Sequence, residues 1–221
     1  MSVDALARRL GHEFADPDLL ELALRHRSAG VNNNERLEYL GDAVLGMIIA
    51  EALFQRFAGA KEGELTRARA RLVKEPTLAE IARGFKLGPV LALGSGELKS
   101  GGRDRDSILS DALEALIGAI YLDGGFEATR TVVLSWYADR LEDINPQKLE
   151  KDPKTRLQEY LQAKGHGLPL YTVEEERGEP HNRHYRVSCA IQDQAPYMGE
   201  GTGRRRAEQM AAQAALEALG L

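Results

Sequence analysis

Residues 32–45 read Asn-Asn-Asn-Glu-Arg-Leu-Glu-Tyr-Leu-Gly-Asp-Ala-Val-Leu. The apolar spacing predicts a helix from Glu35 to Phe57, on which Glu35, Glu38 and Asp42 fall at i, i+3 and i+7 and stack along one face. No Lys or Arg lies three or four positions from Glu38. Because like charges at this spacing cost about 0.2 to 0.5 kcal/mol per pair, we expect a cation from outside the helix.

A second acidic pair stands in the other strongly apolar segment, predicted as a helix from Ile108 to Leu122. Asp111 and Glu114 are its only charges, at i and i+3, again with no cation at helical spacing. We expect Ser107 to cap this helix and Gly124-Gly125 to end it. Both apolar helices therefore carry uncompensated carboxylates.

Four carboxylates from two helices form a hard oxygen ligand set, which suits Mg²⁺ or Mn²⁺. One alternative is that these acids are solvated or paired with arginines brought in by the tertiary fold. A di-iron bundle is another, but it needs Glu-x-x-His on its helices. The residue three after Asp111 is Glu114, and Gly41 stands three after Glu38. The metal site is thus the favoured hypothesis.

A carboxylate-held Mg²⁺ offers a route to phosphodiester hydrolysis without a side-chain nucleophile. In agreement, the chain has no P-loop and no Gly-x-Ser-x-Gly motif. His26 and Ser28 are close in sequence, but a packing or capping role is the better interpretation of both.

The first part of the chain is predicted to be all-α. Further helices are expected in the ranges 3–10, 17–25 (capped by Asp16), 64–73, 76–84 and 128–141, with a polar loop over 94–106. Residues 142–152 are charged and contain Asn145-Pro146, which is typical of a linker. The expected domains are 1–144 and 153–221, joined by a linker over 145–152.

The second domain is predicted to be a small α+β unit of order α-β-β-β-α. Helices are expected over 154–164 and 205–219, and strands over 171–176, 185–191 and 197–201. In the middle strand Val187 and Cys189 alternate with polar positions. One face of this strand is therefore expected to pack in the core and the other to face solvent. Arg204, Arg205 and Arg206 open the last helix, where side chains and free N–H groups favour phosphate.

Composition is that of a globular protein: 221 residues, 43% hydrophobic and 29% charged. The single cysteine, Cys189, excludes an intramolecular disulfide and fits a core position in a reducing cytoplasm. No apolar run is long enough for a membrane span. The formal charge of −5 does not exclude nucleic acid, since a local basic patch suffices. We expect a cytoplasmic protein without membrane contacts.

The residues at 33–45 are similar over their whole length to the signature of the bacterial ribonuclease III family. Glu-Leu-Lys-Ser-Gly-Gly at 97–102 and Lys-Asp-Pro-Lys-Thr-Arg-Leu-Gln-Glu-Tyr-Leu-Gln at 151–162 also resemble that family. The second half resembles a double-stranded RNA-binding domain. The resemblance covers nearly the entire chain, and it implies a helical endonuclease domain followed by this RNA-binding domain.

The resemblance implies a homodimer that cuts double-stranded RNA with Mg²⁺, leaving 5′-phosphates, 3′-hydroxyls and short 3′ overhangs. Processing and decay of rRNA and mRNA precursors is the implied role, with no organic cofactor. The implied site residues are the metal ligands Glu38, Asp42, Asp111 and Glu114, with Glu35 and Glu62 as further acids of the cleavage centre. Glu35 could also cap its helix.

In the RNA-binding domain, the resemblance places Thr155, Gln158 and Gln162 toward a minor groove, His181 toward the next minor groove, and Arg204 and Arg205 on phosphates. Gly203 departs from the serine common there, and its loss of a hydroxyl is expected to weaken phosphate binding. The rival hypothesis is a duplex-binding regulator that does not cut. That hypothesis predicts that one or more of the metal-binding carboxylates is missing, whereas Glu38, Asp42, Asp111 and Glu114 are all present in the sequence.

Overall fold

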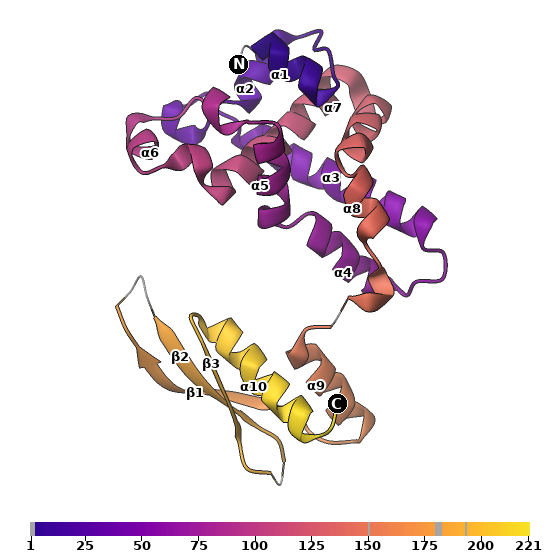
Figure 1. Cartoon of the computed structure of the whole chain (residues 1–221), viewed down its shortest axis with the longest axis vertical. Helices are drawn as coiled ribbons and strands as arrows, with labels where there is room; N and C mark the ends of the chain where they lie inside the picture. Colours follow the sequence, from indigo (N-terminus) through magenta and orange to yellow (C-terminus); the bar gives the residue numbers. More distant parts are fainter. Residues whose placement is uncertain (1–2, 150, 180–182, 193) are drawn as a thin grey trace. The chain divides into compact units, whose positions relative to one another are not determined.

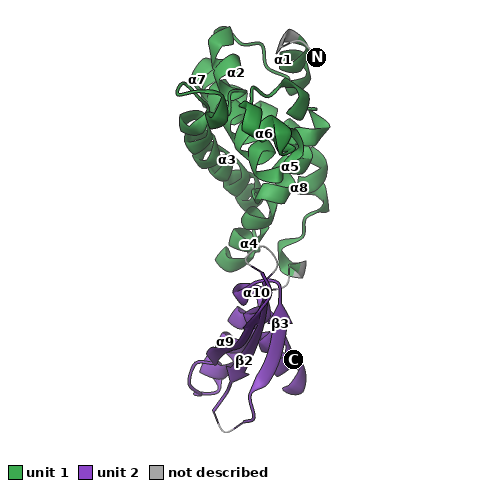
Figure 2. Ribbon diagram, turned by 90° about the vertical axis from the view of Figure 1, so that its left-hand side faces the viewer, with its two compact units in different colours: residues 1–149 green, residues 150–221 purple. Residues whose placement is uncertain are grey.

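The chain folds into two compact units, residues 1–149 and 150–221 (Figure 2). The computed structural model describes residues 3–149, 151–179, 183–192 and 194–221. The first unit is helical and the second combines helices with a sheet (Figure 1), which confirms the predicted all-α and α+β classes. Within the described part of the chain, no helix is long and apolar enough to cross a membrane.

The first unit consists of α-helices joined by short turns and 3-10 helices. Their bounds are Val3–Leu10 (α1), Pro17–Ala23 (α2), Arg27–Ala29 (η1), Glu35–Arg56 (α3), Glu62–Leu72 (α4), Glu75–Gly84 (α5), Gly88–Val90 (η2), Ser95–Lys99 (α6), Gly102–Asp104 (η3), Asp106–Trp136 (α7), Ala138–Asp143 (α8) and Pro146–Lys148 (η4).

Several helix ends differ from the sequence-based prediction, each for a local reason. Helix α4 starts two residues early because the Glu64 carboxylate accepts the Lys61 N–H at 2.8 Å. Ser107 lies inside α7 instead of capping it, since the helix already begins at Asp106. At Gly125, by contrast, the backbone leaves the helical conformation (φ 76°, ψ −177°) and divides α7 where the helix was expected to end. The polar loop over 94–106 contains the short helix α6.

Helices α3 and α7 form the centre of the first unit, with the other helices arranged around them (Figure 1). Leu45 and Ile48 of α3 and Leu113 and Ile117 of α7 are fully buried. Burial of such side chains contributes roughly 1.5 to 3 kcal/mol each. The expected central position of the α3 helix is confirmed.

The second unit carries an antiparallel sheet of order β1-β2-β3. Its elements are Pro153–Ala163 (α9), Leu170–Arg177 (β1), His184–Ala190 (β2), Tyr197–Gly201 (β3) and Arg204–Ala218 (α10). Val187 and Cys189 are fully buried, as their alternation predicts. Ser188, expected on the solvent-facing side of the strand, is also buried. Its hydroxyl is satisfied there because it donates to the Glu174 carboxylate at 2.6 Å.

Helix α10 lies in direct contact with β3 because glycines face it. A Cβ added at Gly199 would lie 2.1 Å from the backbone nitrogen of Ala211, and one at Gly201 would lie 2.8 Å from that of Ala207. Only glycine fits at such separations. The sheet therefore fixes the first half of α10.

Candidate metal centre and nucleic-acid interface

Three of the four predicted ligands meet where α3 passes α7. Glu38, Asp111 and Glu114 each offer a carboxylate oxygen, and these oxygens lie within 4.8 Å of one another. All three residues are partly buried. Such a set of hard oxygen donors fits a divalent cation such as Mg²⁺ or Mn²⁺.

Two glycines let the helices approach closely enough to form this cluster. A Cβ at Gly41 would lie 1.8 Å from the carbonyl oxygen of Glu114, and one at Gly118 would lie 2.2 Å from that of Leu37. The backbones therefore touch on both sides of the crossing. Glu38 stands one turn before Gly41, which brings its carboxylate to Glu114.

The cluster concentrates negative charge, and the Arg27 charge only partly offsets it at Glu38 and Asp111. Burial, and then the charges of Asp42, Asp111 and Glu38, raise the pKa of Glu114 to about 8. Burial and the Asp111 charge also raise the pKa of Glu38. Burial raises the pKa of Asp111, although the Ser110 hydroxyl acts in the opposite direction. Acids with such perturbed pKa values cluster at functional sites.

Asp42, the fourth predicted ligand, is exposed one turn further along α3 and stands outside the group of three. Its charge still contributes to the raised pKa of Glu114. The structure thus places Asp42 at the edge of the cluster, and its role as a ligand stays a prediction.

Glu35 is exposed and pairs with Arg27 of η1, with 3.6 Å between Oε1 and Nη1. For Glu35 the cation expected from outside the helix is thus an arginine of the segment before α3, as the alternative of tertiary arginine partners predicts. As the first residue of α3, Glu35 donates its N–H to the Asn33 side chain at 3.1 Å. Its own side chain acts through charge, helping to raise the pKa of Glu38.

Glu62 begins α4 and accepts a hydrogen bond from the Thr66 hydroxyl at 2.8 Å. The structure does not bring it into the group of Glu38, Asp111 and Glu114. A catalytic role for Glu62 accordingly stays a prediction that rests on the family resemblance.

Sequence patterns missed three residues that act on the cluster electrostatically. Glu75 raises the pKa of Asp111, whereas His26 and Arg27 lower it. No local spacing signals these effects, because the tertiary fold brings α5 and η1 to α7. His26 is buried and its Nδ1 lies 2.8 Å from the Ser28 hydroxyl, which confirms the packing and capping interpretation.

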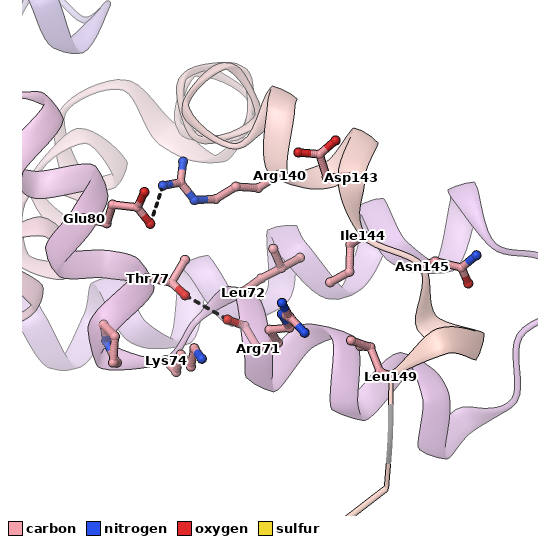
Figure 3. A pocket seen from close by; sticks show the side chains of 11 residues that line it. Arg71, Leu72, Lys74, Thr77, Glu80, Arg140, Asp143, Ile144, Asn145 and Leu149 are labelled. Atoms are coloured by element: carbon pink, nitrogen blue, oxygen red, sulfur yellow. Dashed lines mark hydrogen bonds and ion pairs between the residues drawn. The ribbon is translucent and has the colours of Figure 1, made fainter.

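A separate hollow of about 530 Å³ lies between α4, α5 and α8 (Figure 3). Arg140 pairs there with Glu80 at 2.9 Å, and the Thr77 hydroxyl donates to the Arg71 carbonyl at 3.0 Å. None of the clustered acids lines this hollow. It therefore does not belong to the candidate metal centre.

In the second unit, Thr155, Gln158 and Gln162 are exposed on one face of α9. Arg204 and Arg205 occupy the first two positions of α10 and are also exposed. The Arg204 Nε donates to Glu208 at 3.0 Å, which leaves its terminal nitrogens free of described side-chain partners. His181, predicted to reach a second minor groove, lies outside the described residues.

The fold and these two surfaces define a class of protein: a helical nuclease unit followed by a double-stranded RNA-binding unit. The ribonuclease-III-like family profile matches residues 16–141, and the double-stranded RNA binding motif matches residues 153–219. The chain is 56% identical to Ribonuclease 3 of Ectopseudomonas mendocina over 221 residues, covering 100% of this chain and 96% of the relative.

A second relative is Ribonuclease 3 of Vibrio atlanticus, 54% identical over 98% of this chain and 97% of its own length. Among solved structures, the nuclease domain of ribonuclease III from Campylobacter jejuni is 44% identical with a TM-score of 0.62. It covers 65% of this chain and 99% of that domain. The chain belongs to the ribonuclease III family of double-strand-specific endoribonucleases.

Proposed function

We propose that the protein hydrolyses phosphodiester bonds in double-stranded RNA with Mg²⁺, for which Mn²⁺ substitutes. The products are 5′-phosphate and 3′-hydroxyl ends with short 3′ overhangs, and the substrates are rRNA and mRNA precursors. One observation carries the proposal: the carboxylates of Glu38, Asp111 and Glu114 converge, and burial and repulsion between carboxylates raise their pKa values. Family membership supplies the substrate class.

Glu38, Asp111 and Glu114 would hold the metal ion, with Asp42 completing the set from the next turn of α3. When bound, a divalent ion lowers the pKa of water and offsets charge that develops on the phosphate. The three acids are partly buried and their oxygens already lie within 4.8 Å of one another, so little rearrangement is needed to hold one ion. Glu35 and Glu62 are proposed as further acids of the cleavage centre.

The second unit is proposed to bind the duplex through its shape. Thr155, Gln158 and Gln162 would face one minor groove from α9, and Arg204 and Arg205 would contact phosphates. His181 would reach the following minor groove. Modules of this kind span roughly 16 base pairs and read the 2′-hydroxyls with little sequence preference.

A homodimer is proposed to present two cleavage sites to the two strands. Tyr39, Met47 and Phe54 of α3 are 82%, 61% and 72% exposed and lie on one helix face. A mainly apolar hollow of about 420 Å³ adjoins Met47 and Phe54. Exposed apolar surface of this kind marks interaction sites. The nuclease domain of ribonuclease III from Campylobacter jejuni is 45% identical to this chain. One solved structure of that domain is reported to show structural flexibility in a region involved in dimer formation.

The test is incubation of the purified protein with an end-labelled RNA duplex, with and without Mg²⁺, followed by mapping of the product ends. Glu114→Gln and Asp42→Asn are expected to abolish cleavage and to leave duplex binding nearly intact. Glu21→Gln, which removes an exposed charge from α2, is the control and should cleave normally. Cleavage without metal, or cleavage restricted to single strands, would overturn the proposal. Binding without any cleavage would favour the non-cutting regulator.

A further inference from the structure

One acid in the RNA-binding unit holds two cations that come from two different helices. Glu208 of α10 is 9% exposed. Its Oε2 lies 2.5 Å from Lys154 Nζ of α9, and its Oε1 accepts a hydrogen bond from Arg204 Nε at 3.0 Å. The carboxylate therefore links the first turns of both helices.

Lys154 is held from a second side. Its ammonium lies 4.5 Å from the centre of the Tyr171 ring of β1, within the range of a cation–π contact. The side chain is only 34% exposed, unlike a solvated surface lysine. Lys154 is thus a fixed anchor for Glu208.

A neighbouring contact joins the same two helix starts. Gln209 Nε2 donates to Asp152 Oδ2 at 2.6 Å, and Asp152 Oδ1 accepts the Lys154 N–H at 2.9 Å as the cap of α9. Burial alone would raise the pKa of Glu208, but hydrogen bonds from Lys154 and Arg204 lower it overall. The carboxylate is therefore charged at neutral pH.

The helix starts joined in this way carry the proposed duplex contacts. Thr155 follows Lys154 directly, and Arg204 is the first residue of α10. We propose that Glu208 is a positioning residue for duplex binding, fixing the Arg204 guanidinium and the spacing between α9 and α10 to match groove and phosphate. The inference rests on the proposed function, since it assumes that these helices bind double-stranded RNA.

Electrostatics alone makes the opposite prediction. A carboxylate beside the RNA surface repels phosphate, so its removal would release two cations, tighten binding and steepen the salt dependence. Positioning predicts weaker binding, because two mobile side chains must be ordered when the duplex binds. The sign of the change in affinity therefore separates the two effects.

The test uses full-length Glu208→Gln, with duplex affinity, cleavage kinetics and thermal unfolding as the measurements. We expect the Kd and KM for a long duplex to rise about fivefold to tenfold, and kcat at saturating RNA to stay unchanged. Glu217→Gln is the matched control: it removes the same charge from α10, and its amide oxygen can still accept the hydrogen bond from Gln213. This control should bind like the wild type.

A second variant keeps the test decisive if Glu208→Gln unfolds the unit. Lys154→Met combined with Glu208→Met leaves neither partner of the ion pair buried alone and removes the acceptor of the Arg204 Nε–H. Arg204 stays unanchored, so duplex affinity should remain low in a folded protein. Unchanged or tighter binding by either folded variant overturns the inference. Failure of the wild-type protein to bind duplex RNA would instead overturn the proposed function.

Discussion

The backbone of Gly41 touches that of Glu114: a Cβ at Gly41 would lie 1.8 Å from the Glu114 carbonyl oxygen. This contact joins the α3 and α7 helices at the level of the candidate metal centre. Glu114 thus supplies both a carboxylate of the cluster and a backbone carbonyl at the close helix contact. Packing and chemistry depend on the same contact.

Gly41→Ala is expected to lower stability by about 1 to 3 kcal/mol, because the added methyl overpacks the crossing. The separated helices would also part Glu38 from Glu114, so duplex cleavage should be lost even in the folded variant. Urea unfolding and a cleavage assay check both effects. Gly84→Ala, at the end of α5 where a Cβ meets nothing within 4 Å, should not lower stability and should leave cleavage unchanged. A fully active Gly41→Ala protein would contradict the argument.

Glu114 makes the stability of the metal-free protein depend on pH. Its pKa rises from 4.5 to about 8 in the folded state, so the folded protein binds the extra proton. The stabilisation from this group is complete below pH 4.5 and is lost as pH rises to about 8. Glu114→Gln should therefore be more stable than the wild type at pH 8 and similar at pH 4.5. Thermal unfolding of both proteins in the presence of a chelator, from pH 4.5 to pH 8, tests this prediction. Parallel curves of unfolding temperature against pH for the two proteins would refute it.

Glu114 lies inside the group of three acids and Asp42 at its edge. We therefore expect the two residues to contribute unequally to stabilisation of the protein by a bound metal ion. Mn²⁺ should raise the unfolding temperature of the wild type, since an ion that binds only the folded state stabilises it. Glu114→Gln should lose this shift, whereas Asp42→Asn, altered at the edge of the cluster, should retain part of it. Calorimetric titration with Mn²⁺ measures the affinities directly. Equal losses in both variants would place Asp42 among the primary ligands.

Much of the fold was predictable because its signals are local. The apolar period of α3 and the alternation around Val187 and Cys189 depend on neighbouring residues. The break at Gly124-Gly125 was predictable as well, because glycine readily adopts the positive φ observed at Gly125. Helix α6 was missed because its five residues carry too little periodicity.

The acidic site was predictable only in part, for the same physical reason. Spacing shows that Glu38 and Asp42 share a face of α3 and that Asp111 and Glu114 share a face of α7. Helical spacing does not show how close each carboxylate comes to the other helix where α3 crosses α7. It therefore did not predict that Asp42 would lie outside the group formed by Glu38, Asp111 and Glu114. The Arg27 partner of Glu35 comes from η1, outside helical reach.

Arg205 offers a test of the proposed phosphate contacts. It is exposed at the start of α10 and has no ion-pair partner among the described residues. Arg205→Ala should weaken duplex binding for all sequences and reduce the slope of log K against log salt by roughly one. Lys86→Ala, an exposed cation of the nuclease unit, is the control and should leave the slope unchanged. If Arg205→Ala leaves the slope of log K against log salt unaltered, Arg205 does not contact phosphate in the complex.

The exposed apolar face of α3 predicts the oligomeric state. Phe54→Asp places a charge on a side chain that is 72% exposed in the single chain, so folding of the chain itself should be unaffected. In a dimer the same charge would be buried without a partner, which costs several kcal/mol. Light scattering should accordingly give a dimer mass for the wild type and a monomer mass for Phe54→Asp. Leu98→Asp, at a 44% exposed leucine of α6, should remain dimeric. A monomeric wild type would contradict the proposed homodimer.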